Sequence, residues 1–306
     1  MGSAVTSNTL IALPGDEALA ESLAGGLDAA IAALEYRRFP DGESYLRIHD
    51  SLQETTAVLV ARLDRPDPKI PALLFAADLA RDLGASAVGL AAPYLPYMRQ
   101  DIRFQPGEAL TSASFARWVS RHFDWLVTVD PHLHRYAGLN EIYSVPAVAV
   151  SAAPALAEWI FTNVEKPVII GPDVESSQWV EAVAARHGLP WRVMHKQRFG
   201  DREVRIAVPD LSALEGHTPV LLDDIVSSGA TLARAAEALS DAGMASPVCA
   251  VVHGLFSESC RETLKAVGVR RLVCTDSVQA PEAGIVLAPL LTPAIERMSD
   301  CAAGRR

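Results

Sequence analysis

Short apolar runs rich in β-branched residues alternate with segments of helical periodicity along most of the chain, and this alternation limits the possible folds most strongly. Seven runs have the composition of buried strands: 56–63, 86–95, 125–130, 167–173, 219–224, 247–256 and 270–276. Between several of them lie amphipathic segments such as 71–84 and 230–243. Strands that alternate with helices pair in parallel, because each helix carries the chain back to the same edge of the sheet. We therefore predict an α/β fold in which mainly parallel strands are flanked by helices.

Two stretches in different halves of the chain share one pattern. Residues 76–95 and 235–256 each read as a helix, a glycine and then a buried strand. Gly84 and Gly243 occupy the position of a glycine that ends a helix. The length of 306 residues is enough for two ordinary domains. The pattern favours two related domains in tandem, although any two helix–glycine–strand units would look alike.

Composition excludes several classes of protein. Half of the residues are hydrophobic, which is enough to form a packed core. The formal net charge is −10, so the chain has no excess of basic residues to bind nucleic acid. The longest apolar region, 145–161, contains two prolines and Glu158, which favours a place inside a globular fold over a membrane span. The four cysteines form no C-x-x-C pair. The N-terminus has no secretory signal pattern, and we expect a cytoplasmic protein.

The stretch VLLDDIVSSGATLARAA (220–236) joins an apolar strand to an alanine-rich helix. The connecting loop then lies at the carboxyl edge of a parallel sheet, where α/β proteins bind ligands. Backbone N–H groups at the start of the helix attract an anion, most naturally a phosphate. Ser227, Ser228 and Thr231 add hydroxyl groups, and Gly229 allows the backbone to approach a ligand closely.

The two acids before this loop need a different ligand group. Asp223 and Asp224 are negative and do not favour a phosphate, but a pair of carboxylates suits two neighbouring sugar hydroxyls. The stretch therefore predicts a ribose phosphate site. The alternative is a polar strand end followed by an ordinary Ser or Thr helix cap. The order of acids, hydroxyls and glycine resembles the phosphoribosyl pyrophosphate loop of phosphoribosyltransferase-type folds, with Ala230 where a glycine is frequent.

Further motifs follow each other in a fixed order. They are RRFPDGESYLRI (37–48), PYLPYMRQDIRFQPGEALTS (93–112), VDPHLHR (129–135), GPDVESSQWVEAVAARHG (171–188) and HKQRFGDREVRI (195–206). Together with the loop they resemble the ribose-phosphate diphosphokinase family, closer to its archaeal-type branch, over nearly the whole chain. The resemblance implies two tandem phosphoribosyltransferase-like domains. We expect the first, with the nucleotide-binding motifs, at 1–148, and the second, with the ribose-phosphate loop, at 149–306, its last helix packing back on the first.

The resemblance also implies an activity. Members of this family transfer the diphosphate of ATP to the 1-hydroxyl of ribose 5-phosphate, with Mg²⁺, and release phosphoribosyl pyrophosphate and AMP. The partners expected are these two substrates, without nucleic acid or membrane. Family members assemble the adenine site across a subunit interface, so the resemblance implies a homo-oligomer.

The family pattern assigns roles to individual positions of this sequence. Six residues would bind ATP, three of them adenine and three the phosphates: Phe39, Asp41 and Glu43, and Arg99, Gln100 and Asp101. His132 would bind the metal or the triphosphate, and Asp173 would bind the metal or the ribose hydroxyls. The resemblance alone favours His132 over His134. Lys196 and Arg198 would be catalytic, and their alternate positions on an extended segment put them on one side.

Taken one at a time, these motifs have plain structural alternatives. Asp-Gly in FPDGE is a common turn dipeptide, Arg-Gln-Asp suits a solvated loop, and a histidine at a strand end is usually structural. Two other functions stay open. A phosphoribosyltransferase would explain the 220–231 loop but not the other motifs. A catalytically silent regulatory paralogue is favoured slightly by Val174 and Glu175, where the family usually has Ala-Gly or Lys-Gly.

Overall fold

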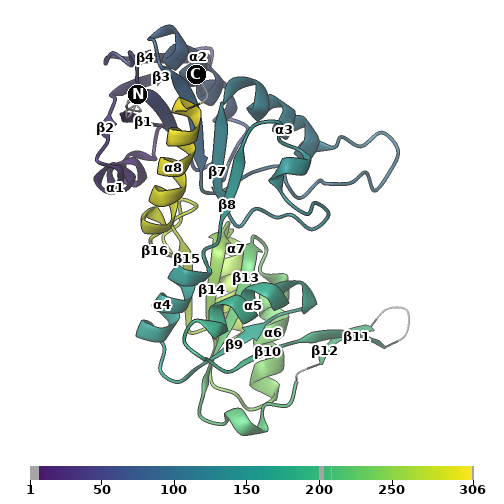
Figure 1. Ribbon diagram of the computed structural model, residues 1–306. Coiled ribbons are helices and arrows are strands. Elements are labelled where there is room, and N and C mark those ends of the chain that lie inside the picture. The colour runs from purple at the N-terminus through teal and green to yellow at the C-terminus, as the bar shows by residue number, and fades with distance from the viewer. Residues whose placement is uncertain (1–6, 200–202, 208, 305–306) are drawn as a thin grey trace. The chain divides into compact units, whose positions relative to one another are not determined.

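The computed structural model describes residues 7–199, 203–207 and 209–304, and it leaves the side chains of 196–199 and 203–207 undescribed (Figure 1). The chain forms two compact units. The first comprises Met1–Val150 and Ala288–Arg306, and the second Ser151–Leu287. Both are α/β units with parallel sheets flanked by helices, as the alternation in the sequence predicts.

The first unit is built on a six-stranded parallel sheet with the order β2-β1-β5-β6-β7-β8. Its strands are β1 (Asn8–Ala12), β2 (Ala30–Ile31), β5 (Thr56–Val60), β6 (Ala87–Ala92), β7 (Trp125–Val129) and β8 (Ala147–Val150). Its helices are α1 (Glu17–Leu27), α2 (Ile70–Asp82), α3 (Thr111–His122), the 3-10 turn η1 (Leu139–Glu141) and α8 (Ala288–Ala303).

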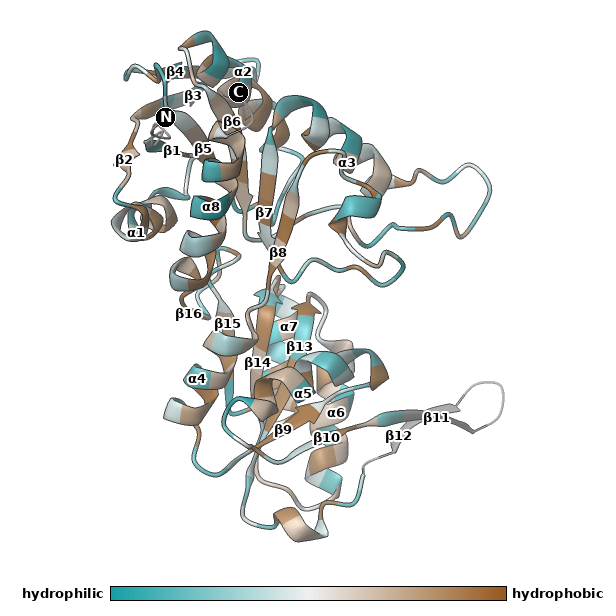
Figure 2. Cartoon of the chain, viewed as in Figure 1, coloured by the Kyte–Doolittle hydropathy of each residue, from teal (hydrophilic) through white to brown (hydrophobic). Residues whose placement is uncertain are grey.

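Each face of this sheet is covered by its own pair of helices. On one face, residues of α2 and α3 share a core cluster with Leu59, Leu90 and Leu126. On the other face, α8 packs against β6, β7 and β8 and against α1. Buried apolar side chains of the strands therefore alternate between two cores, which explains why the strands read as continuous hydrophobic runs (Figure 2).

The second unit contains another six-stranded parallel sheet, with the order β10-β9-β13-β14-β15-β16. Its strands are β9 (Pro167–Gly171), β10 (Trp191–Val193), β13 (Thr218–Val226), β14 (Val248–Gly254), β15 (Arg271–Thr275) and β16 (Ala283–Ile285). Its helices are α4 (Ala153–Asn163), α5 (Ser177–Ala185), α6 (Ala230–Asp241) and α7 (Glu258–Ala266), with 3-10 turns η2 (Val174–Ser176) and η3 (Ser212–Leu214).

The two units repeat one topology. Within each six-stranded sheet, the second strand along the chain (β2 or β10) lies at the edge. The first strand (β1 or β9) lies between it and the third (β5 or β13). Each also inserts a two-stranded antiparallel hairpin before that third strand: β3 (Leu34–Arg38) with β4 (Ser44–Ile48), and β11 (His195–Phe199) with β12 (Glu203–Ala207). Gly84 and Gly243 follow α2 and α6 with φ of 91° and 77°, the left-handed conformation expected of a helix-ending glycine. The internal similarity in the sequence thus reflects a repeated structural unit.

One strand is longer than the sequence indicates. The apolar run 219–224 predicts a strand that ends with the two acids, whereas β13 continues to Val226. The reason is the neighbouring strand, because Asp223 pairs with Val251 and Ile225 with His253 of β14. Within the described residues, no helix is long and apolar enough to cross a membrane.

Candidate functional site

Three carboxylates gather at the carboxyl edge of the second unit. Asp173 follows β9, Asp223 and Asp224 lie near the end of β13, and the two strands are neighbours in the sheet. Burial raises the pKa of Asp223 well above its usual value, and repulsion from Asp224 and Asp173 raises it further. Asp224 is itself buried. Three neighbouring carboxylates indicate a site that binds a cation or hydrogen-bond donors such as hydroxyl groups.

Hydrogen bonds to the backbone fix the pair on β13. Asp223 Oδ1 accepts from the backbone N–H of Asp224 at 3.0 Å, and Asp224 Oδ1 accepts from that of Ile225 at 2.7 Å. Asp173 is anchored in a similar way at the start of η2, where its Oδ1 accepts from the N–H of Glu175 at 3.2 Å. The unusual Val174 and Glu175 therefore form a short turn that still holds Asp173 at the end of its strand.

The loop after β13 leads directly into α6. Gly229 precedes the helix with a φ of 73°, a left-handed conformation that side chains other than glycine adopt at a cost. Ser228 is exposed, and Ser227 and Thr231 are half-buried. The N–H of Ser257 donates to the carbonyl of Ser227 at 3.3 Å and ties the loop to the start of α7. The predicted combination of hydroxyl groups, glycine and helix N-terminus is thus present on the same edge as the three acids.

We expect Gly229→Ala to lower the stability of the protein by more than the strain of a left-handed backbone alone would. A Cβ at Gly229 would lie 2.6 Å from Cys260 Sγ, a buried side chain of α7. Gly243→Ala is the matched control, because Gly243 has a similar φ but no atom within 4 Å of its Cβ position. The control should lose about 1 kcal/mol of stability, and Gly229→Ala clearly more. Chemical denaturation of both variants measures this, and equal losses would contradict the packing argument.

Two loops meet at the carboxyl edge of the first unit. Arg99, Gln100 and Asp101 lie in the connection after β6, and His132 lies after the neighbouring β7. Arg135 Nε forms an ion pair with Asp101 Oδ1 at 3.4 Å, with the Asp101 side chain only 7% exposed. Ser112 at the start of α3 donates from its hydroxyl to the carbonyl of Gln100 at 3.1 Å. The Asp101–Arg135 pair therefore joins two loops that belong to separate motifs of the sequence.

The backbone at this edge departs from common conformations. Tyr97 and Asp130 have φ of 63° and 30° although neither is glycine. Tyr97 lies two residues before Arg99, and Asp130 lies two residues before His132. The His132 ring packs edge-on against the ring of His134, with the two centroids 3.8 Å apart. Such strain costs on the order of 1 kcal/mol or more per residue and clusters at functional sites. This supports a binding role for both loops.

The FPDGE motif forms the turn of the β3–β4 hairpin. Phe39 N–H donates to the carbonyl of Glu43 at 2.8 Å, and Glu43 N–H donates to Asp41 Oδ1 at 3.2 Å. Phe39 is 40% exposed, and the Arg37 guanidinium lies over its ring at 4.7 Å from the centroid. The turn alternative is thus correct as local structure. It leaves an aromatic ring and two carboxylates presented to solvent.

Lys196 and Arg198 fall on β11, the second unit's hairpin strand, opposite Ile206 and Val204 of β12. Their side chains lie outside the described part of the structure, so their catalytic role stays a prediction. Sequence reasoning missed Arg135, which holds Asp101 in place. The available signal was the H-x-H-R pattern of 132–135, in which only the first histidine was given a role.

Parallel sheets in a repeated topology, with an acid pair and a glycine loop at the carboxyl edge of β13, define a protein of the phosphoribosyltransferase-type fold. Residues 138–281 match the family described as "Phosphoribosyl transferase domain". Residues 9–121 match the family described as "N-terminal domain of ribose phosphate pyrophosphokinase".

Relatives over nearly the full length identify the chain further. It is 35% identical to a ribose-phosphate pyrophosphokinase of Methanopyrus kandleri, over 92% of this chain and 96% of that one. It is 33% identical to the enzyme of the same name from Methanothermobacter thermautotrophicus, over 92% and 98%. The crystal structure of phosphoribosylpyrophosphate synthetase from Mycobacterium smegmatis superimposes with a TM-score of 0.79 at 25% identity, covering 95% of this chain and 98% of that one. The chain belongs to the ribose-phosphate pyrophosphokinase family, and the resemblance to archaeal members is confirmed.

Proposed function

We propose that this protein is a ribose-phosphate diphosphokinase, which transfers the diphosphate of ATP to the 1-hydroxyl of ribose 5-phosphate and releases AMP. The observation that carries the proposal is the edge of the second unit, where Asp223, Asp224 and the 227–231 loop lie in order along β13 and into α6. This arrangement offers acceptors for sugar hydroxyls directly before donors for a phosphate. The family membership supports the same reaction.

The ribose 5-phosphate would be held at both of its ends. In the proposed site the 5-phosphate lies against the backbone N–H groups of the loop and the start of α6, with Ser227, Ser228 and Thr231 as hydroxyl donors, and Gly229 and Ala230 as backbone donors. The carboxylates of Asp223 and Asp224 accept hydrogen bonds from the ring hydroxyls. Fixing the sugar at two ends orients its 1-hydroxyl for an in-line attack, which removes much of the entropic barrier.

ATP would be bound by residues of the first unit. We propose Arg99, Gln100 and Asp101 for the triphosphate, with Arg99 offering the forked geometry that matches phosphate oxygens. Phe39, Asp41 and Glu43 would hold adenine by stacking and by accepting from its amino group. The exposed ring and acids of the FPDGE turn support this role, since they have no interior packing to serve. A second copy of the chain could supply this turn, so we propose a homo-oligomer, acting in the cytoplasm.

Magnesium fits the residues proposed to bind it. Carboxylate oxygens are the ligands Mg²⁺ prefers, and the Asp173 carboxylate at the end of β9 repels the neighbouring Asp223, so a cation there would relieve that repulsion. We propose Asp173 in the second unit and His132 in the first as metal-binding residues. Bound Mg²⁺ would neutralise phosphate charge during transfer. Lys196 and Arg198 would stabilise the charge that develops on the transferred group.

The reaction can be tested by product analysis. Purified protein with ATP, ribose 5-phosphate and Mg²⁺ should form AMP at a rate that depends on the sugar phosphate. ADP in place of AMP would contradict diphosphate transfer, since ADP marks the transfer of a single phosphoryl group. A phosphoribosyltransferase would instead consume phosphoribosyl pyrophosphate in the presence of a nucleobase. A silent paralogue would give no turnover with any of these mixtures.

A further inference from the structure

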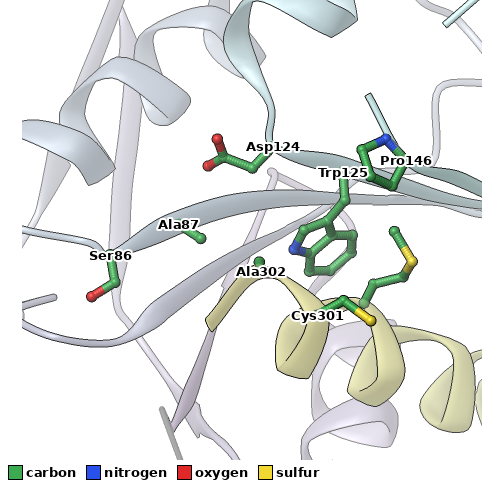
Figure 3. A pocket seen from close by; sticks show the side chains of 8 residues that line it. Ser86, Ala87, Asp124, Trp125, Pro146, Cys301 and Ala302 are labelled. Atoms are coloured by element: carbon green, nitrogen blue, oxygen red, sulfur yellow. The ribbon is translucent and has the colours of Figure 1, made fainter. Parts of the chain in front are cut away.

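Charged side chains of the first unit gather at the carboxyl edge of its sheet, in the loops after β1 and β5. Asp16 and Arg62 form a buried ion pair there at 3.3 Å. Lys69 pairs with Asp64 at 2.7 Å. The opposite edge is different, because a cavity of about 220 Å³ at the amino ends of β6 and β7 has mainly apolar walls, among them Trp125 (Figure 3). The candidate ATP-binding loop follows the carboxyl end of β6, so the charged loop after β5 is its neighbour.

Asp67 lies on the loop between β5 and α2, where its backbone is held stiffly. Pro66 and Pro68 flank it, and a proline ring fixes the backbone angle φ. The N–H of Lys69 donates to the carbonyl of Pro66 at 2.8 Å, which closes the turn around Asp67. Lys69 Nζ donates to the carbonyl of Arg62 at 2.5 Å and ties the turn to the end of β5. The Asp67 carboxylate is therefore carried on a rigid support.

One hydrogen bond connects this support to the candidate ATP-binding loop. The hydroxyl of Tyr97 donates to Asp67 Oδ1 at 2.5 Å. Short bonds to a carboxylate are stronger than those between neutral groups. Burial and the Asp67 carboxylate raise the pKa of Tyr97 to about 12, so the hydroxyl keeps its proton and remains the donor at neutral pH. Two loops that follow neighbouring strands are thus joined by a bond to a charged group.

Tyr97 has a backbone conformation that needs support. Its φ of 63° is left-handed, which costs free energy in residues other than glycine. Such a conformation persists only where the surroundings hold it. The Tyr97 ring packs on Phe115 with centroids 5.1 Å apart, and the Tyr97 carbonyl accepts from the Thr111 hydroxyl at 3.2 Å. Phe115 and Thr111 both belong to α3, so the Asp67 bond adds a restraint from a different element.

The turn at Tyr97 determines how the next residues are presented. Met98 is only 2% exposed and belongs to the hydrophobic core, whereas Arg99 directly after it is exposed. One buried and one exposed neighbour require a fixed direction of the chain, which the left-handed residue before them provides. A change of conformation at Tyr97 would therefore move Arg99 away from the place where it is proposed to meet phosphate oxygens.

We propose that Asp67 is a positioning residue for ATP: through Tyr97 it holds the loop that presents Arg99 to the triphosphate. The inference rests on the proposed function in taking the loop after β6 as part of the ATP site. Asp67 acts through Tyr97 and not on the substrate itself. Its loss should therefore weaken ATP binding and leave both the chemical step and the sugar site unchanged.

Asp67→Ala tests this role in the full-length protein. The KM for ATP should rise by about fivefold to tenfold, because the bond that holds Tyr97 is lost. The kcat and the KM for ribose 5-phosphate should stay within about twofold of the unaltered protein. Tyr97→Phe removes only the hydroxyl and should have the same effect. The double variant should be no worse than either single variant, because both remove one and the same bond.

Two further variants provide the rescue and the control. Asp67→Asn should recover most of the ATP affinity, because its amide oxygen still accepts a hydrogen bond from Tyr97. Asp78→Ala removes the same charge from an exposed position further along α2, and its KM for ATP should stay within about twofold. An equal rise in Asp78→Ala would assign the effect to net charge and overturn the proposal.

ATP affinity measured by calorimetry without ribose 5-phosphate separates this inference from the proposed reaction. Weaker ATP binding in Asp67→Ala and Tyr97→Phe would support the inference even if the unaltered protein formed no AMP, a result that would overturn the reaction alone. Unchanged ATP affinity in both variants would overturn the inference, and so would an unaltered protein that does not bind ATP. A loss confined to kcat would overturn it as well, since a merely structural role reduces the amount of folded protein without changing a KM.

Discussion

Lys196→Ala should lower kcat for phosphoribosyl pyrophosphate formation by roughly two to three orders of magnitude, with much smaller changes in the KM values of ATP and ribose 5-phosphate. Negative charge shifts onto the equatorial and leaving oxygens as the β-phosphorus is attacked. Fixed cations that meet this charge only in the transition state accelerate the chemical step without tightening substrate binding. Arg198→Ala should behave alike, since residue 198 is two positions further along β11.

The residue between them supplies the control. Gln197 lies on the same strand, out of phase with both cations, so Gln197→Ala should keep kcat within about threefold. Initial rates at saturating substrates compare the three variants. More than about half of the turnover retained by Lys196→Ala would show that the hairpin is not catalytic. An equal loss in Gln197→Ala would show that the strand acts only through its fold.

Replacing either acid of the β13 pair by alanine should raise the KM for ribose 5-phosphate by about tenfold or more. Each carboxylate is proposed to accept a hydrogen bond from the sugar, and a hydrogen bond to a charged group is worth about 1.5–3 kcal/mol. The KM for ATP should change less, because the nucleotide is assigned to the first unit. An unchanged sugar KM in both Asp223→Ala and Asp224→Ala would refute the assignment.

The pKa of Asp223 adds a stability test with a definite sign. Its pKa is raised in the folded protein, so the folded state binds more protons than the unfolded chain between the two pKa values. Stability from this group is therefore greatest below about pH 4 and falls as the pH rises through the folded pKa. Asp223→Asn removes the buried charge, and its Tm should exceed that of the unaltered protein at pH 8 by a few degrees, with the gain disappearing near pH 4.

An acid outside the site controls for this measurement. Asp210 is exposed, and hydrogen bonds from Ser212 lower its pKa, so Asp210→Asn should not raise the Tm at pH 8. A Tm for Asp223→Asn that shows no pH-dependent gain would contradict the repulsion between the three carboxylates. If Asp223→Asn makes the protein more stable and also raises the KM for ribose 5-phosphate, Asp223 is retained for function and not for stability.

Local signals in the sequence were sufficient for the architecture. Apolar runs such as 167–173 and 247–256 became buried parallel strands, because a strand covered on both faces needs apolar residues at every position. Gly84 and Gly243 ended helices in both halves, because left-handed backbone is a property of the residue itself. The hydroxyl residues and Gly229 correctly predicted the start of α6, because helix starts and tight turns are determined by a few neighbouring residues.

Long-range pairing was decided only by the tertiary structure. β13 extends past its apolar run because β14 continues beside it, which no local pattern of the acids indicates. Asp16 looks like a loop residue, yet it is fully buried and accepts from the backbone N–H of Arg62, 46 residues away, at 2.9 Å. The Asp101–Arg135 pair likewise joins loops that follow two different strands, β6 and β7. Such contacts depend on which strands become neighbours, and that choice is made by the packing of the whole unit.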